Sequence, residues 1–148
     1  MASNRITFTL NYLVALLNGS ADRLLRANFS LTYSQFLFLV TLQGLGASTP
    51  SFLADRLGVS RAAVSQRLTW FEERRLIYIS RAMDNQKSLS LRLTKQGAAL
   101  ASDSADFLEA EFRKLFFGLP NVDLDGLDKT LNQLASQLIE RQEARNAA

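Results

Sequence analysis

Apolar residues recur three or four positions apart through most of the chain, and two short stretches depart from that spacing. Residues 5–27 keep the helical spacing and predict a long first helix. Residues 34–45 are almost continuously apolar and predict a buried second helix. A short third helix follows, with Thr49 as its cap, Pro50 at its first position and Gly58 after its last turn.

The fourth predicted helix, residues 60–74, has two chemically different faces. Val64, Leu68 and Phe71 are spaced four and three apart, so they point inward together. Ser60 is placed to cap the helix. The opposite face carries small and polar side chains, those of Arg61, Ala62, Ser65, Gln66 and Thr69.

After the fourth helix the apolar period changes from helical to alternating. Residues 76–79 are β-branched and aromatic, and residues 88–93 alternate strictly between polar and apolar. Both patterns are typical of strands, and the polar residues 83–87 between them predict a turn. The sequence therefore predicts a two-stranded hairpin, or wing, directly after the fourth helix.

Two further helices are predicted beyond the wing, at about 95–117 and about 123–145. Thr94 caps the first of them. The second has leucines at alternating spacings of three and four, a coiled-coil seam made of Leu124, Leu127, Leu131, Leu134 and Leu138. Together with Leu10 and Leu13 of the apolar first helix, this seam favours packing on a second copy of the chain. Packing within one chain is the alternative.

Residues 53–70 hold a short helix, a tight turn at Gly58 and a capped helix with a polar start. Helix-turn-helix DNA readers share this design, since a small, hydrogen-bonding helix start fits the major groove. The alternative is an ordinary solvated helix face. The residues predicted to contact double-stranded DNA from this helix are Ser60, Arg61, Ala62, Ser65, Gln66, Arg67 and Thr69.

Three of these side chains have specific candidate roles in base recognition. Arg61 has the geometry for a bidentate contact to guanine or for a phosphate contact, and Gln66 for pairing with adenine. The methyl group of Ala62 is suited to the methyl group of thymine.

The charge distribution agrees with a nucleic-acid partner. Residues 51–100 contain nine Lys or Arg and four Asp or Glu, a net charge of +5. Residues 101–148 contain five basic and nine acidic residues, a net charge of −4. Phosphates would be drawn to the middle of the chain. A plain solvated surface is the alternative.

The chain has no cysteine and no histidine. This excludes disulfides, thiolate or histidine metal sites, and Ser-His or Cys-His catalysis. Asp123, Asp125 and Asp128 do not fit a calcium loop, because Leu134 stands where the closing glutamate belongs, so Asp123 is predicted to be a helix cap. We expect no cofactor, no metal and no enzyme activity; a Ser-Lys arrangement is the one catalytic plan left open.

The apolar run Ile6–Leu17 is interrupted by Thr7, Thr9 and Asn11 and keeps helical spacing. It is too short for a membrane span, which needs about 18 apolar residues or more. We expect a cytoplasmic protein with no membrane partner.

Three stretches of sequence match those of a known family: Leu31-Thr-Tyr-Ser-Gln-Phe36, then Leu53-Ala-Asp-Arg-Leu-Gly-Val-Ser60 with Val64-Ser65 and Leu76-Ile77, then Leu93-Thr94-Lys-Gln-Gly97. With the predicted order of elements, they resemble the MarR family of winged helix-turn-helix regulators over about residues 5–145. The resemblance implies a mainly α fold with a small β-hairpin wing, in which a winged helix-turn-helix is flanked by N- and C-terminal dimerisation helices. It implies one domain, residues 1–148, with dimerisation helices at 5–30 and 98–145 and the DNA-binding region at 31–97.

The resemblance also implies a homodimeric repressor on a pseudo-palindromic operator, released by a small aromatic or phenolic ligand. Such a ligand would bind in a pocket bordered by Phe8, Tyr12, Phe36 and Trp70. Plain core packing is the alternative for these four aromatic side chains.

The chain departs from the family pattern at the wing and just before it. Family members commonly carry Asp-x-Arg or Asp-Arg-Arg at the wing tip, and Arg75 stands where the family usually has glycine. The wing residues predicted to contact DNA are Arg81, Asn85, Gln86 and Lys87. Because Gln86 has no charge to offer a minor groove, a protein-interaction module with weak or no specific DNA binding is the alternative function.

Overall fold

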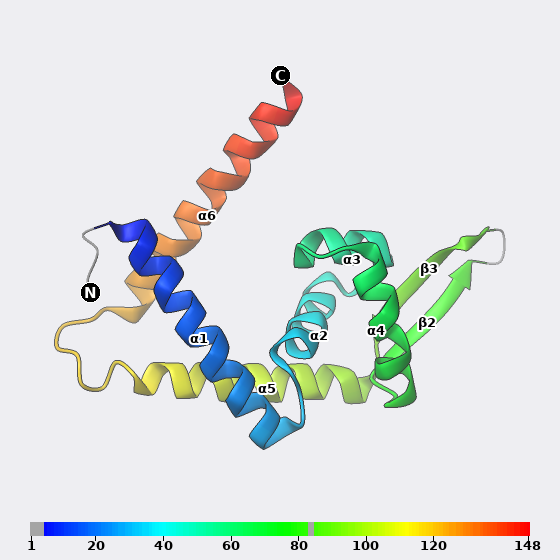
Figure 1. Ribbon diagram of the computed structural model, residues 1–148, viewed down its shortest axis with the longest axis horizontal. Helices are drawn as coiled ribbons and strands as arrows, with labels where there is room; N and C mark the ends of the chain where they lie inside the picture. Colours follow the sequence, from blue (N-terminus) through cyan, green and yellow to red (C-terminus); the bar gives the residue numbers. More distant parts are fainter. Residues whose placement is uncertain (1–4, 83–84) are drawn as a thin grey trace. The chain divides into compact units, whose positions relative to one another are not determined.

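The computed structural model describes residues 5–82 and 85–148, and the side chains of residues 82–88 lie outside that description. Its elements in chain order are α1 (Ile6–Phe29), α2 (Tyr33–Leu45), β1 (Ala47–Ser48), α3 (Pro50–Leu57), α4 (Arg61–Glu73), β2 (Ile77–Ala82), β3 (Asn85–Leu93), α5 (Lys95–Lys114) and α6 (Leu124–Ala147) (Figure 1). The chain divides into two compact units, residues 1–111 and 112–148, and each is described by itself.

The mainly helical fold class with a small sheet is confirmed, but the sheet is larger than the sequence predicted. Its three strands lie in the antiparallel order β1-β3-β2. The extra strand, β1, pairs Ala47 with Arg92 and Ser48 with Leu91. A strand of two residues is too short to show an alternating pattern, which is why the sequence did not predict it.

Helix boundaries follow from side-chain caps. The Thr32 hydroxyl accepts a hydrogen bond from the Gln35 backbone N–H at 3.1 Å, and the Gln35 side chain accepts one from the Thr32 N–H at 2.9 Å. This reciprocal pair is a capping box. Thr49 caps α3, with Pro50 next to it, and Asp123 caps α6, as predicted. The predicted helix at 95–117 ends earlier, at Lys114.

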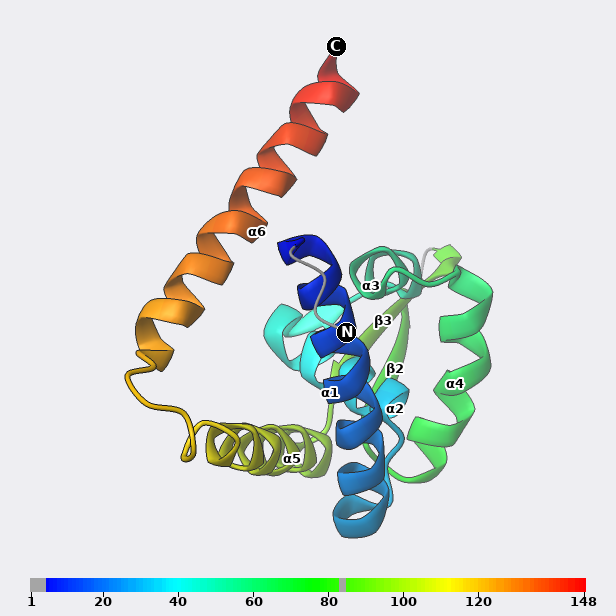
Figure 2. The same ribbon diagram turned by 60° about the vertical axis from the view of Figure 1, so that its left-hand side comes forward.

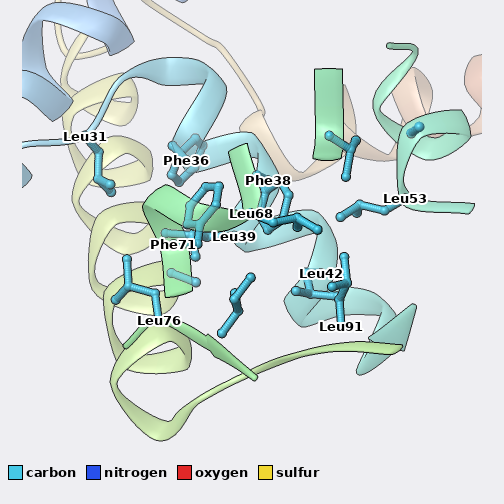
Figure 3. Close-up of a cluster of buried hydrophobic side chains, with 14 of the residues drawn as sticks. Leu31, Phe36, Phe38, Leu39, Leu42, Leu53, Leu68, Phe71, Leu76 and Leu91 are labelled. Carbon is cyan, nitrogen blue, oxygen red and sulfur yellow. The ribbon is translucent and has the colours of Figure 1, made fainter. Parts of the chain in front are cut away.

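The core of the first unit lies between α2, α4 and the inner face of the sheet (Figure 3). Phe38 of α2 and Phe71 of α4 stack with their ring centres 4.1 Å apart. Val64 and Leu68 are buried beside them, which confirms the inward face predicted for the fourth helix. One face of α4 therefore packs in the core, and the opposite face does not take part in this packing.

Helix α2 also connects the core to α5. The Gln43 side-chain amide donates hydrogen bonds to the Ser102 hydroxyl at 2.8 Å and to the Ala98 carbonyl at 3.3 Å. Phe29, at the end of α1, meets Phe107 of α5 edge to face with ring centres 5.4 Å apart. These contacts hold α1, α2 and α5 together.

The second unit, residues 112–148, contains the last residues of α5, the segment that follows them and α6. Within α6, which the structure describes in full, no side chain is buried. Four leucines of the predicted seam are 40% to 53% exposed: Leu127, Leu131, Leu134 and Leu138. None of the described helices is both long and apolar enough to cross a membrane.

Candidate nucleic-acid interface

The turn between α3 and α4 redirects the chain within three residues. Gly58 adopts a left-handed conformation with φ of 66°, which glycine reaches without steric cost. The Val59 N–H donates to the Ala54 carbonyl at 3.0 Å, so the end of α3 is satisfied by the turn itself. The next residue, Ser60, caps α4 by accepting a hydrogen bond from the Ala63 N–H at 3.1 Å.

The outer face of α4 presents the polar side chains that the sequence singled out. Arg67 is half-buried, at the border between this face and the core. The other six predicted residues are exposed: Ser60, Arg61, Ala62, Ser65, Gln66 and Thr69. We call these six residues the reading face. It offers a guanidinium, an amide and three hydroxyl groups to solvent within about two and a half turns of helix.

The far end of α4 closes in a Schellman motif. The Arg75 N–H donates to the Glu72 carbonyl at 2.9 Å, and the Leu76 N–H to the Phe71 carbonyl at 3.0 Å. This motif needs a left-handed residue, and Arg75 takes that conformation with φ of 58°. Arg75 thus occupies a position where glycine would have the lowest conformational cost.

The start of α5 is tied to the same place by the Leu-Thr-x-x-Gly segment. The Thr94 hydroxyl donates to the Arg75 carbonyl at 2.7 Å and accepts from the Gly97 N–H at 2.9 Å. The Thr94 N–H donates to the Leu76 carbonyl at 3.0 Å. Thr94 therefore caps α5 and at the same time joins it to the segment that leads from α4 into the wing.

The wing continues from this joint as strands β2 and β3. Their register pairs Tyr78 with Arg92 and Arg81 with Leu89, and it shifts between Arg81 and Ala82. Arg81 is exposed. The other predicted wing residues, Asn85, Gln86 and Lys87, have side chains outside the described part of the chain.

The N-terminal end of α4 and the described ends of β2 and β3 lie toward the same side of the first unit. In Figures 1 and 2 the N-terminal end of α4 lies beside α3, and the described ends of β2 and β3 rise toward that same side. The C-terminal end of α4 lies at the base of the wing, on the opposite side. One flat partner could therefore meet the start of α4 and the wing together.

The aromatic residues of the predicted ligand pocket lie in different environments. Phe8 and Tyr12 of α1 are 57% and 68% exposed, whereas Phe36 is buried and stacks on Tyr33 at 6.1 Å. Trp70 is half-buried, and Arg74 lies over its ring at 4.1 Å. This contact between a cation and an aromatic ring was not predicted from the sequence, although the i, i+4 spacing of the two residues is a signal for it.

Helix α1 exposes an apolar surface at its N-terminal half. Leu10 is half-buried and Leu13 is 44% exposed. Other large apolar side chains of α1 are more exposed, namely Ile6, Phe8, Tyr12, Val14 and Leu16. The sequence predicted an apolar first helix, but the exposed apolar face extends beyond Leu10 and Leu13.

Comparison with known proteins shows which proteins these features resemble. A model of the MarR family matches residues 29–84, the stretch from the end of α1 into the wing. AbsC, a MarR family transcriptional regulator from Streptomyces coelicolor, is 25% identical, with a TM-score of 0.68 over 95% of this chain and 97% of AbsC. No curated protein matches the sequence.

Two further solved structures share the fold at lower identity. Streptococcus pneumoniae FabT, in complex with DNA, is 20% identical with a TM-score of 0.72, over 92% of this chain and 96% of FabT. Bordetella bronchiseptica BpsR, whose DNA binding is regulated by 6-hydroxynicotinic acid, is 19% identical with a TM-score of 0.65, over 86% of this chain and 98% of BpsR.

Proposed function

Because this chain has the fold of the MarR family and a winged helix-turn-helix sequence that matches that family's model, we propose that it is a DNA-binding regulator of transcription that works as a cytoplasmic homodimer. The proposal depends above all on the exposed reading face of α4, whose N-terminal end lies toward the same side of the first unit as the described ends of β2 and β3. The proposal assigns no catalytic role, no cofactor and no metal to the chain.

Each subunit would place the start of α4 in a major groove. Arg61 would contact guanine or a phosphate, Gln66 would read adenine, and Ala62 would touch a thymine methyl group. Ser60, Ser65, Arg67 and Thr69 would add hydrogen bonds to bases or phosphates. The wing would follow the backbone or the minor groove through Arg81, Asn85, Gln86 and Lys87. FabT, which shares the fold, has been solved with DNA bound, and this supports the docking mode.

The exposed leucines support the proposed dimer. Leucines exposed in series on α6, and the exposed apolar side chains of α1, are the kind of surface that a second subunit covers. The proposed interface includes Leu10, Leu13, Leu124, Leu127, Leu131, Leu134 and Leu138. Two reading heads related by a two-fold axis call for a pseudo-palindromic operator with half-sites about one helical turn apart.

The proposed output is repression, through steric exclusion of polymerase from the operator. A small aromatic or phenolic ligand would bind in a pocket bordered by Phe8, Tyr12, Phe36 and Trp70. It would weaken DNA binding by favouring a dimer in which the spacing of the two α4 helices does not match the operator. The relative BpsR, whose DNA binding is regulated by 6-hydroxynicotinic acid, supports a ligand of this size.

The first test is binding of a fluorescent DNA from the protein's own upstream region, with scrambled DNA as competitor. We expect selective binding that weakens by orders of magnitude between about 50 and 200 mM salt, because phosphate contacts release counterions. Arg61→Ala and Gln66→Ala should each cost about 1–3 kcal/mol of binding free energy. Arg23→Ala, at an exposed position of α1, is the matched control and should bind as the parent does.

A second candidate function is a protein-interaction module that kept the winged helix fold. The uncharged Gln86 in the wing favours it, because a narrow minor groove attracts arginine. If this candidate holds, the parent binds all DNA equally weakly, and Arg61→Ala changes nothing on DNA. Gln86→Arg separates a weakened wing from a lost function, since it restores selective binding only in the first case.

A further inference from the structure

Thr94 makes hydrogen bonds of two kinds at the base of the wing. Its N–H donates to the Leu76 carbonyl at 3.0 Å, next to the strand pair formed by Ile77 and Leu93, so this bond continues the ladder of the wing itself. Its hydroxyl donates to the Arg75 carbonyl at 2.7 Å. Arg75 lies between the end of α4 and the start of β2. The hydroxyl therefore ties the end of the wing to the segment that leaves α4.

The conformation of Arg75 sets the direction in which the wing leaves α4. The helix ends at Glu73 and β2 begins at Ile77, so three residues turn the chain. Arg75 is left-handed, with φ of 58°, a conformation that a residue other than glycine keeps only where its surroundings hold it. The Glu72 carbonyl accepts the Arg75 N–H at 2.9 Å, and the Thr94 hydroxyl holds the Arg75 carbonyl. The peptide that leads into the wing is thus fixed by that hydroxyl.

The same hydroxyl also connects the wing to α5. It accepts a hydrogen bond from the Gly97 N–H, in the first turn of α5, at 2.9 Å. Thr94 is 8% exposed, so water has little access to replace either of the two bonds of its hydroxyl. Loss of the hydroxyl would leave a carbonyl and an N–H without these partners, which is unfavourable for buried groups. One oxygen atom therefore links the end of α4, the wing and the start of α5.

We propose that Thr94 is a positioning residue for DNA recognition, because its hydroxyl holds the wing at the angle to α4 that lets both elements meet one duplex. The functional part of this inference rests on the DNA binding proposed above. In Figures 1 and 2 the C-terminal end of α4 lies at the base of the wing, and the described ends of β2 and β3 lie far from it. β3 spans nine residues, about 30 Å, so a small rotation at its base moves its far end by several ångströms.

The first test measures the distance between α4 and the wing in the full chain, without DNA. The chain has no cysteine, so the substitutions Thr69→Cys on α4 and Ser90→Cys on β3, both at exposed positions, introduce two sites for spin labels. The labelled chain is refolded with an excess of unlabelled chain, so that each measured distance lies within one chain. Thr94→Val removes the hydroxyl and keeps the backbone N–H and the branched shape. Thr94→Ser keeps the hydroxyl.

We expect Thr94→Val to lose the single narrow distance of the parent and Thr94→Ser to keep it. Thr32→Val is the matched control, because it removes the hydroxyl that caps α2. It should lower stability as Thr94→Val does and keep the parent's distance. Circular dichroism checks the fold, and where Thr94→Val does not fold, Thr94→Ala removes the same hydroxyl. An unchanged distance in the folded variant without the hydroxyl overturns the proposal, as does an equal change in Thr94→Ser or Thr32→Val.

The second test measures binding of the same variants to the DNA that the parent selects. Thr94→Val should bind at least about tenfold more weakly than the parent, a difference of about 1.4 kcal/mol. Its affinity should also depend less on salt, because phosphate contacts of the wing are lost. Thr94→Ser and Thr32→Val should keep both parent values. Parent-like affinity and salt dependence in Thr94→Val overturn the positioning role. A parent that binds no DNA contradicts the proposed function, whereas the distances, measured without DNA, still decide whether the hydroxyl holds the wing.

Discussion

Gly97 lies directly against the carbonyl oxygen of Leu76, so closely that a Cβ atom at position 97 would overlap that oxygen. The same carbonyl accepts the Thr94 N–H, and the Thr94 hydroxyl binds both the Gly97 N–H and the Arg75 carbonyl. The start of α5 and the segment after α4 are therefore in backbone contact. Gly97 lies in a helix and has no unusual φ, so its backbone conformation does not require glycine. The close approach of the Leu76 carbonyl is what requires a residue without a Cβ atom.

Gly97→Ala should destabilise the fold. Either α5 or the backbone at Leu76 must move to admit the methyl group. Overpacking of this kind typically lowers the free energy of unfolding by about 1–3 kcal/mol. Urea unfolding followed by circular dichroism measures the change. Gly44→Ala is the matched control, because a Cβ there would meet no described atom within 4 Å. In the helix α2 this control should stabilise by roughly 0.5–1 kcal/mol. Equal effects of the two substitutions would contradict the close contact.

Arg75→Gly should stabilise the fold by up to about 1 kcal/mol, because relief of the left-handed conformation exceeds the entropy that glycine loses on folding. The change in unfolding free energy is measured in the same way. Arg56→Gly, in the helical last turn of α3, is the control and should destabilise, because helical backbone disfavours glycine by about 1 kcal/mol. A loss of stability in Arg75→Gly would mean that the guanidinium makes a favourable contact that outweighs the strain.

The sequence predicted the helices and the two long strands because their signals are local. Thr49, Ser60 and Asp123 are cap residues at the expected helix starts, and the buried face of α4 follows from the spacing of Val64, Leu68 and Phe71. These features depend on neighbours within one or two turns. Periodicity and capping chemistry report such neighbours reliably.

Features that depend on distant residues were not predicted. β1 exists because Ala47 and Ser48 happen to lie beside β3, more than 40 residues away in sequence. A pocket at the base of the wing is lined by Arg75, after the end of α4, and by Lys95, at the start of α5, and it exists only in the folded chain. The sequence shows an arginine at position 75 where a glycine was expected. Its left-handed conformation and its place in the lining of this pocket follow only from the backbone and from the position of α5.

The hydrogen bonds of Asp22 predict that the folded protein loses stability as the pH becomes acid. Its carboxylate accepts a hydrogen bond from the Tyr33 N–H at 2.9 Å and one from the Arg26 guanidinium at 2.7 Å. These contacts, the backbone hydrogen bond first, lower the pKa of Asp22 from its ordinary value of 3.8. Because the pKa of Asp22 is lower in the folded state, its ionised carboxylate stabilises the fold at pH values above the pKa of the unfolded state. This stabilisation is lost as the pH falls through the pKa of the folded state.

Asp22→Asn should therefore flatten the decline of stability between about pH 5 and the acid unfolding limit. Urea midpoints across this range measure the slope for the parent and the variant. Asp103→Asn, at an exposed position of α5, is the control and should keep the parent's slope. If Asp22→Asn has the same slope as the parent, the charge of this carboxylate does not contribute to the decline of stability at acid pH.

Leu131→Glu should separate the proposed dimer into folded monomers. The side chain is 42% exposed on α6, so the substitution costs little within one chain, but in a seam between subunits it would bury a charge. Burying a leucine contributes about 1.5–3 kcal/mol, so the dimer dissociation constant should rise by tenfold or more. Sedimentation equilibrium measures that constant, and circular dichroism checks that the helix content is retained. Gln133→Glu adds the same charge two residues away on α6 and should leave the dimer intact. If Leu131→Glu and Gln133→Glu give the same dissociation constant, the leucine seam is not the subunit contact, and the exposed apolar side chains of α1 become the remaining candidate for it.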